Sequence, residues 1–196
     1  MTASARKRPT GAPIAEPPRK AGRRQQAVPL TVSRPELIVN GSDREFRELV
    51  HNLFGFAALH ERIRSGHAKF IELGGIEYTV LIAIAHLGLE GDVNVKTVAD
   101  HLHLSGAFIT TTTRRLLQMD LIHKTMDTVD RRRVTLTVSS KGRAALEKLA
   151  PVQRRLNDIE FDSLSREEFK FLNRLVKRLI ESSDRAVALQ NYLLSG

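Results

Sequence analysis

The amino-acid sequence predicts a mainly α-helical fold with a small β-hairpin, in which a winged helix-turn-helix is flanked by long N- and C-terminal helices. Three observations support this prediction. Two short helical segments, 95–102 and 106–119, follow one another with only a tight turn between them. Two short strands come next, and the second of them, 133–138, alternates apolar with polar side chains. Longer segments with apolar residues at helical spacing lie on both sides of this unit.

The flanking segments have recognisable starts and stops. Ser42 and Glu45 have the Ser-x-x-Glu spacing of a capping box, and a helix is expected over 43–70. The next segment, 76–87, is apolar almost all round, which is typical of a central buried helix. After the hairpin, helical spacing resumes at Ser139 and continues, beyond a second capping box at Ser165, to about residue 192.

The two short helices also carry capping residues. Asn94 can cap the helix 95–102, with Val93 and Val98 as its hydrophobic staple. Ser105 can cap the helix 106–119. The strands are expected at 121–126 and 133–138, so that the tip of the hairpin is formed by the residues between them.

Composition separates the N-terminus from the rest of the 196 residues. Residues 1–35 contain eight Lys and Arg against one acidic residue and six of the seven prolines, so most of the net charge of +9 lies there. We expect a disordered basic arm over 1–35 and a folded domain over 36–196. The arm could add phosphate or minor-groove contacts, or it could be a solubilising tail.

Other classes of protein are disfavoured by composition. The chain has no cysteine, so disulfides, thiolate zinc sites and a cysteine nucleophile are excluded. No apolar run approaches the roughly 18 residues that a membrane span needs. The basic N-terminus lacks the apolar region of a signal peptide. We therefore expect a soluble, cytoplasmic protein.

The helix 106–119 has two faces of different character. Ile109, Leu116 and Leu117 are expected to point inward, whereas Ala107, Thr110, Thr111, Arg114 and Gln118 fall at i, i+3, i+4, i+7 and i+11 and form the opposite face. β-Branched threonines lower helix stability, so a run of four at 110–113 indicates selection for something other than helicity.

The chemistry of this face suits duplex DNA. Threonine offers a hydroxyl for phosphates or base edges and a methyl group for thymine, and Arg114 can bind guanine O6 and N7. The alternative is a solvated helix face with Thr112 and Thr113 partly in the core. At the hairpin tip, three arginines follow Asp130; they could enter a minor groove, and one could instead pair with Asp130. The expected DNA contacts are Ser105, Ala107, Thr110, Thr111, Thr113, Arg114, Gln118, Arg131, Arg132 and Arg133.

Several segments taken in order resemble the MarR family of bacterial regulators. They are 93–99, 104–105, 115–116, 121–122 and 130–142. The last resembles the family's wing pattern of Asp-x-Arg, four or five residues, Leu-Thr, two residues and Gly. Asp120 stands where the family usually has glycine, and Val138-Ser139 replaces Leu-Thr. The similarity covers about residues 43–190, with the winged helix-turn-helix at about 76–138.

The resemblance implies how the protein would act. It implies a homodimer built by dimerisation helices at about 43–70 and 140–192, with Thr110, Thr111 and Arg114 at the major groove and Arg132 at the minor groove. The recognition helices of a two-fold dimer lie about one DNA turn apart, roughly 10 bp, so the operator should be an inverted repeat in double-stranded DNA. It also implies an effector, such as a small aromatic or lipophilic acid or its coenzyme A thioester.

A candidate effector site lies on the first long helix. His60, Arg64 and His67 are spaced at i, i+4 and i+7, near Phe56 and Phe70, and could hold a carboxylate or phosphate. The alternative is a solvated or interface face. His101 and His103 have the wrong helical spacing to share a metal. No catalytic motif is present, so we expect no enzyme, no metal site and no cofactor.

Two functions follow from the sequence. The first is a cytoplasmic, nucleoid-associated, sequence-specific regulator, a dimeric repressor relieved by a small molecule. The second is a non-specific architectural DNA-binding protein that relies on its basic arm.

Overall fold

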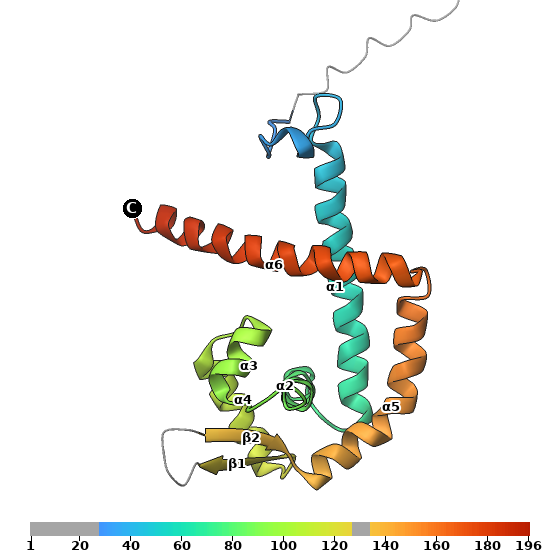
Figure 1. Ribbon diagram of the computed structural model, residues 1–196, viewed down its shortest axis with the longest axis vertical. Helices are drawn as coiled ribbons and strands as arrows, with labels where there is room; N and C mark the ends of the chain where they lie inside the picture. Colours follow the sequence, from blue (N-terminus) through green and yellow to red (C-terminus); the bar gives the residue numbers. More distant parts are fainter. Residues whose placement is uncertain (1–27, 127–133) are drawn as a thin grey trace, which may run out of the picture. The chain divides into compact units, whose positions relative to one another are not determined.

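The computed structural model describes residues 28–126 and 134–196 (Figure 1). Within these ranges the elements are η1 (Pro35–Leu37), α1 (Arg44–Phe70), α2 (Gly75–Leu87), α3 (Val95–Leu102), α4 (Gly106–Gln118), β1 (Ile122–Met126), β2 (Val134–Val138), α5 (Ser140–Glu160) and α6 (Arg166–Leu194). The described residues divide into two compact units, one that ends at residue 51 and one that begins at residue 52. The predicted mainly α fold with a β-hairpin wing is confirmed, and the predicted bounds of α3 match the structure.

Helix α2 is the centre of the larger unit. It contacts α3, α4 and β2, and Figure 1 shows it between the short helices and α1. Its sequence is apolar almost all round because nearly every face is covered. The core contains Ala68, Leu73, Tyr78, Val80, Leu81, Ala83, Ile84, Val93, Val98, Ala99, Ile109, Leu116, Leu121, Ile122, Leu136, Val138 and Leu149.

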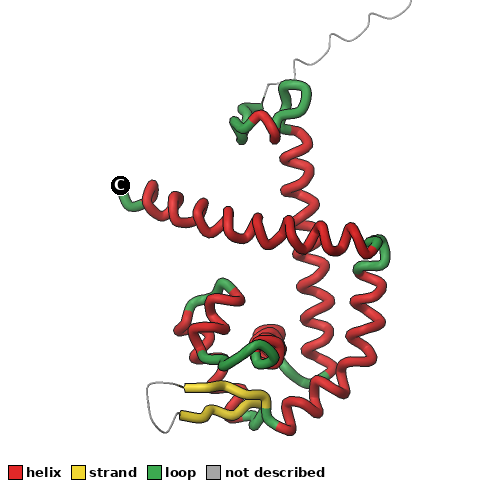
Figure 2. The backbone as a smooth tube through the Cα atoms, in the orientation of Figure 1, coloured by secondary structure: helices red, strands yellow, loops and turns green. Residues whose placement is uncertain are grey.

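The hairpin is anchored to the helices along one edge. β1 and β2 are antiparallel, with Ile122 opposite Val138 and Met126 opposite Val134, and they are the two strands of Figure 2. Leu136 donates its backbone N–H to the carbonyl of Val93, at 2.7 Å, just before α3. Leu136 and Val138 also send their side chains into the core. The base of the hairpin is therefore fixed to the helix-turn-helix by both backbone and side chains.

The end of α4 and the start of α5 are held together by a compact set of hydrogen bonds. Asp120 adopts a left-handed conformation, with φ of 59°, which explains why glycine suits this position in the related pattern. The Ser139 hydroxyl donates to the Asp120 carbonyl at 2.7 Å and accepts from Gly142 N–H at 2.9 Å, so it caps α5. Ser139 thus supplies the capping hydroxyl that threonine would provide in the Leu-Thr pattern.

Glycine is required at position 142 because the hairpin lies too close to leave room for a side chain. A Cβ built on it would lie 2.2 Å from the carbonyl oxygen of Leu121 and 2.8 Å from Cγ1 of Val138. The first of these atoms belongs to the backbone at the start of the hairpin and cannot rotate away. The glycine at the end of the wing pattern is therefore explained by packing of α5 against the hairpin.

The two C-terminal helices differ in burial. α5 buries Gly142 and Leu149, bends along its length in Figure 1 and contains Pro151, which removes one helical hydrogen bond. α6 begins with the capping box predicted at Ser165: Glu168 N–H donates to Ser165 Oγ, and Ser165 N–H donates back to the Glu168 carboxylate. No residue of α6 is buried.

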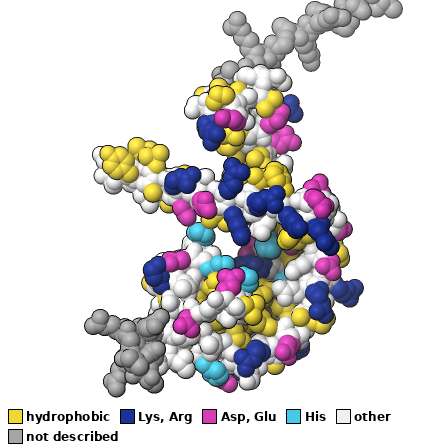
Figure 3. Space-filling view, in the orientation of Figure 1, with side chains coloured by type: hydrophobic (Ala, Val, Ile, Leu, Met, Phe, Trp, Pro, Cys, Tyr) yellow, Lys and Arg dark blue, Asp and Glu magenta, His cyan; other side chains and the backbone are white. Residues whose placement is uncertain are grey.

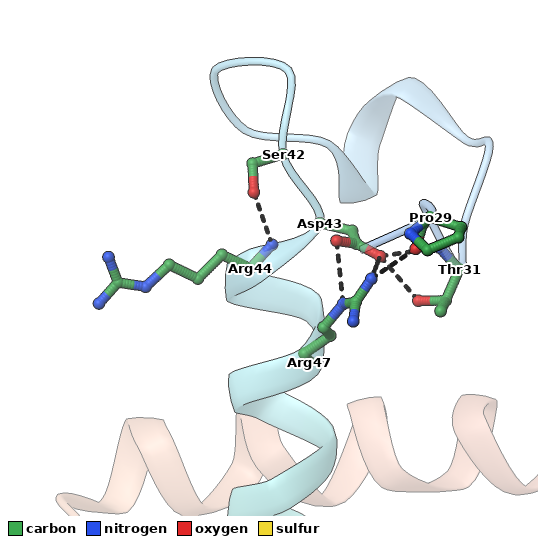
Figure 4. Close-up of polar contacts among 6 residues, drawn as sticks. All are labelled: Pro29, Thr31, Ser42, Asp43, Arg44 and Arg47. Carbon is green, nitrogen blue, oxygen red and sulfur yellow. Dashed lines mark hydrogen bonds and ion pairs between the residues drawn. The ribbon is translucent and has the colours of Figure 1, made fainter. Parts of the chain in front are cut away.

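The start of α1 differs from the prediction. In a capping box, Ser42 Oγ would accept a hydrogen bond from Glu45 N–H. It accepts one from Arg44 N–H instead. Asp43, only 4% exposed, is the organising residue. Figure 4 shows its carboxylate accepting hydrogen bonds from Thr31 and Arg47, while Arg47 also donates to the carbonyl of Pro29.

We call the hydrogen bonds that join Asp43, Thr31, Arg47 and Pro29 the Asp43 clamp. The clamp corrects the expected boundary of the N-terminal arm. The prediction of a disordered segment as far as residue 35 is wrong from Pro29 onward, because this stretch is tied back to α1. The remainder of the arm, residues 1–27, lies outside the described residues. Between η1 and α1 the chain reverses at Asn40 and Gly41, both with positive φ, and Val39 pairs with Ser42.

No single helix within 28–126 and 134–196 is long and apolar enough to cross a membrane. The bent pair Arg44–Phe70 and Gly75–Leu87, with 86° between its members, reaches the required length and composition only when the two are taken together.

The Asp43 clamp predicts an acid-resistant contact. Hydrogen bonds from Arg47, and then from Thr31, hold the pKa of Asp43 well below its usual value of 3.8. A lowered carboxylate pKa contributes stability above the unfolded pKa, and this contribution is lost only as the pH falls through the folded pKa. Asp43→Ala should therefore abolish hydrogen-exchange protection of the Thr31 amide, which the wild type should retain at pH 3.8. The exposed neighbour in the same turn, Glu45→Gln, should leave that protection intact; equal loss in both variants would contradict the role of Asp43.

The close approach at Gly142 predicts that even an alanine side chain at this position lowers the stability of the fold. Gly142→Ala should reduce the free energy of unfolding by about 1–3 kcal/mol, the usual range for overpacking, although alanine is the better helix former. Urea unfolding followed by circular dichroism measures this loss. The matched control is Gly106→Ala at the start of α4, where an added Cβ meets nothing within 4 Å. A Gly142→Ala protein as stable as this control would refute the packing argument.

Candidate nucleic-acid interface

Helices α3 and α4 form a helix-turn-helix whose turn is fixed by its own residues. Asn94 accepts a hydrogen bond from Thr97 N–H at 3.0 Å, and Asn94 N–H donates to Thr97 Oγ1 at 2.8 Å, so α3 begins with a reciprocal capping box. His103 ends α3 in a left-handed conformation, with φ of 52°. Ser105 Oγ then accepts from Phe108 N–H and caps α4. The predicted caps at Asn94 and Ser105 are confirmed.

Helix α4 is anchored by one side and leaves the other free. Ile109 and Leu116 are fully buried, and Leu117 is partly buried. Arg115 reaches from α4 to Glu77 on α2, with 3.1 Å between Nη1 and Oε1. The helix therefore has a fixed rotation about its own axis, which determines which residues face outward.

The outward face is the one that the sequence predicts. The structure exposes Ser105, Ala107, Thr110, Thr111, Arg114 and Gln118. These side chains present small apolar groups and hydroxyl oxygens, with one guanidinium and one amide toward the C-terminal end. Such a face can approach the base edges of a major groove, because its own side chains before Arg114 are small; the half-exposed Phe108 lies beside it.

The structure corrects the expectation for Thr113. This residue is 4% exposed, and its hydroxyl donates to the carbonyls of Ile109 and Thr110. It lies one turn beyond Ile109 on the buried side, as does Thr112, so it belongs to the core and not to the outward face. The arginines predicted at the hairpin tip, Arg131, Arg132 and Arg133, lie outside the described residues.

The candidate effector residues do not form one site. His60, Arg64 and His67 line a cavity of about 410 Å³ between α1, α2, α3 and α5. Phe56 instead lines a second, apolar cavity of about 480 Å³ at the junction of α5 and α6, and His60, which stacks on Phe56, lines both. Phe70 is exposed and is not among the lining residues of either cavity. The full lining of the first cavity is His60, Arg64, His67, Tyr78, Thr79, Ile82, Ala83, His86, His101, Leu102, Gln153 and Asn157.

Sequence reasoning missed most of this lining. Tyr78 and Gln153, 75 residues apart, are joined by a hydrogen bond of 3.0 Å between Gln153 Nε2 and the tyrosine oxygen. Nothing in the local sequence indicates that contact. His86 and His101, whose ring centroids lie 5.9 Å apart, line the cavity as well. Figure 3 shows histidine side chains gathered near the centre of the molecular face in view.

Two buried groups at this site have unmet hydrogen-bonding capacity. Among the described residues, His67 Nε2 and Glu160 Oε2 are buried without a hydrogen-bond partner. The other carboxylate oxygen, Glu160 Oε1, lies 2.9 Å from His60 Nδ1. Burial lowers the pKa of His67, opposed by the charge of Glu160. A neutral imidazole is therefore favoured at His67 at neutral pH, and its ring can exchange hydrogen bonds with an occupant of the cavity.

Arg64 is the permanent charge of the cavity. Its guanidinium donates to Glu61 at 2.7 Å, and these hydrogen bonds lower the pKa of the Glu61 carboxyl. The arginine side chain is only about a quarter exposed, since it lies between Glu61 and the cavity. A guanidinium has five N–H donors, so pairing with Glu61 leaves donors for an anion.

Taken together, a capped helix-turn-helix, an outward-facing α4 and an antiparallel hairpin define a winged helix-turn-helix domain of the DNA-binding class. The model of the MarR family matches residues 77–134, from the first turn of α2 to the first residue of β2. The similarity to the MarR family thus covers the winged helix-turn-helix part of the chain.

One curated relative and two solved structures show what this chain is similar to. The regulator MgrA of Staphylococcus aureus is 29% identical over 116 residues, which cover 59% of this chain and 78% of MgrA. A mutant of MarR from E. coli in complex with operator DNA has the same fold, with a TM-score of 0.57, 17% identity, and coverage of 69% of this chain and 95% of that one. BpsR of Bordetella bronchiseptica, whose DNA binding is regulated by 6-hydroxynicotinic acid, has a TM-score of 0.54 and 22% identity, with coverage of 66% and 90%.

Proposed function

We propose that this protein is a dimeric, sequence-specific transcriptional repressor, with no enzymatic activity of its own, that acts in the cytoplasm and is released from DNA by a small acidic molecule. The observation that carries the proposal is the outward face of α4, which is set by a buried opposite face and presents Thr110, Thr111 and Arg114 together. An arginine beside small side chains can enter the major groove and bind guanine.

Unpartnered apolar surface supports the dimer. α6 buries none of its 29 residues, and α1 leaves large apolar side chains exposed along the part that belongs to the larger unit. These exposed residues are Leu53, Phe54, Phe56, Leu59 and Phe70 on α1 and Phe169, Phe171, Leu172, Val176, Leu179, Ile180, Val187, Leu189, Tyr192, Leu193 and Leu194 on α6. A second copy is the occupant that suits them, since contiguous apolar surface of this extent marks an interface. Two-fold symmetry then favours an inverted-repeat operator with half-sites about 10 bp apart.

The cavity beside Arg64 supports a small-molecule effector. It offers one guanidinium, several imidazoles and the apolar side chains of Ile82, Ala83 and Leu102, which fit an aromatic or lipophilic acid or the acyl part of its coenzyme A thioester. His101 and Leu102 belong to α3, so an occupant would contact the helix-turn-helix itself. BpsR, which shares the fold, is described as regulated by an aromatic acid.

The DNA-binding role predicts the effect of two arginines. Arg114→Ala should weaken binding to the protein's own promoter region by about 1–3 kcal/mol and relax the preference at one base pair. Arg132→Ala should also weaken binding if the hairpin tip enters the minor groove. Fluorescence anisotropy at fixed salt measures both. Arg154→Ala is the control for the loss of one positive charge, because Arg154 is exposed on α5 and lies outside the helix-turn-helix.

Unchanged affinity in both the Arg114 and Arg132 variants would refute the assignment. Deleting residues 1–27 distinguishes the sequence-specific regulator from the alternative, a non-specific architectural DNA-binding protein. A truncated protein that keeps its operator preference reads sequence through the folded domain, whereas loss of all binding on truncation would favour a non-specific protein that relies on the basic arm.

The effector cavity predicts ligand-dependent stability. Benzoate, 4-hydroxybenzoate, 6-hydroxynicotinate and benzoyl-coenzyme A can be compared by thermal shift; a compound present at 100 times its dissociation constant should stabilise the fold by about 2.7 kcal/mol. Arg64→Ala should abolish the shift. Arg62→Ala is the matched control, since Arg62 lines a different cavity. A shift that survives in the Arg64 variant and disappears in the Arg62 variant would place the ligand elsewhere.

A further inference from the structure

The two exposed threonines of α4 have already committed their hydroxyl protons. Thr110 Oγ1 donates to the carbonyl of Gly106 at 2.8 Å, and Thr111 Oγ1 donates to the carbonyl of Ala107 at 3.2 Å. A hydroxyl has one proton to donate and two lone pairs that accept. What these side chains can offer outward without breaking an internal bond is therefore a methyl group and an acceptor oxygen.

This pattern continues along the whole run of threonines. Thr112 and Thr113 donate in the same way to the carbonyls four residues earlier, and both are buried. All four hydroxyls are thus oriented by the helix backbone, a known conformation of threonine within helices. The exposed Thr110 and Thr111 hydroxyls have the same orientation as those of the buried Thr112 and Thr113. Because the buried pair is shielded from solvent, the helix backbone is sufficient to set this orientation.

A protein face that offers only methyl groups and hydrogen-bond acceptors can distinguish between the donors, acceptors and methyl groups that DNA presents. Phosphate oxygens, guanine O6 and purine N7 are acceptors, and they need donors that the side chains of Ala107, Thr110 and Thr111 do not have free. The only apolar group on the floor of the major groove is the 5-methyl group of thymine. Adenine N6 and cytosine N4 carry the hydrogen-bond donors that an acceptor oxygen could meet.

We propose that Ala107, Thr110 and Thr111 recognise thymine 5-methyl groups by methyl contact, on the N-terminal side of the guanine contact made by Arg114. This inference rests on the proposed DNA-binding function and deepens it. The three residues span about 6 Å along the helix axis, at 1.5 Å for each residue. Because base pairs are spaced about 3.4 Å apart, this length matches about two neighbouring base pairs. Each operator half-site therefore contains thymine at one or both of two adjacent pairs, next to a G·C pair.

The experiment replaces thymine by deoxyuridine, which pairs identically and lacks only the 5-methyl group. The full-length protein first selects duplexes from a random 24-bp pool, and single thymines of the enriched half-site are then replaced one at a time. Affinity should fall about fourfold for each contacted thymine, as expected for loss of one buried methyl-sized group. Replacements outside the protected region are the control for effects of deoxyuridine on the duplex.

Two kinds of substitution separate the methyl group from the hydroxyl. Thr110→Ser and Thr111→Ser keep the hydroxyl and remove the methyl, and the preference for thymine over deoxyuridine should fall to about one at the corresponding base pair. Thr110→Val and Thr111→Val keep a methyl-bearing shape and remove the hydroxyl, and they should retain the preference. Thermal unfolding of each variant confirms that the exposed substitutions leave the fold intact.

The opposite pattern would overturn the proposal: serine variants that keep the preference, valine variants that lose it, or a wild type that binds deoxyuridine and thymine duplexes equally. An enriched sequence without thymine dependence defeats the methyl contact and leaves the proposed regulator standing. Failure to enrich any sequence defeats both, because no base is then being recognised.

Discussion

The burial of α2 is the constraint on which the rest of the larger unit depends. α2 carries apolar side chains on almost all of its faces. They are shielded from solvent because α3, α4 and β2 all pack around the helix. This enclosure fixes the rotation of α4, because Ile109 and Leu116 can be buried only if the opposite face points outward. The same enclosure places His86 of α2 beside His101 of α3, at the wall of the cavity. The outward face of α4 and the cavity therefore both depend on how the other elements pack around α2.

Local chemistry made much of the fold predictable. Capping at Asn94, Ser105 and Ser165 depends on residues three positions apart, so the sequence alone identifies those helix starts. The prediction at Ser42 was wrong because a competing residue, Asp43, is stabilised by Thr31 twelve residues earlier. A pattern of nearest neighbours cannot reveal a partner at that separation.

The candidate sites show the same division between local and distant information. The outward face of α4 follows from helical periodicity, and Thr113 was misplaced because threonine is compatible with both a buried and an exposed position. The cavity depended on distant pairings, such as that between Tyr78 and Gln153, which only the folded chain brings together. Periodicity on α1 therefore found three of the cavity residues and also included Phe56 and Phe70, which do not line it.

Pro151 gives the molecule a mechanical property that its helical content would not suggest. The residues of α5 before it pack against the hairpin through Gly142, whereas those after it approach α1, where Glu160 meets His60. A proline without an amide donor leaves the helix softer at this point than on either side. A change in the direction of α5 at Pro151 would therefore alter how its hairpin end and its α1 end are oriented to one another without breaking a further helical hydrogen bond.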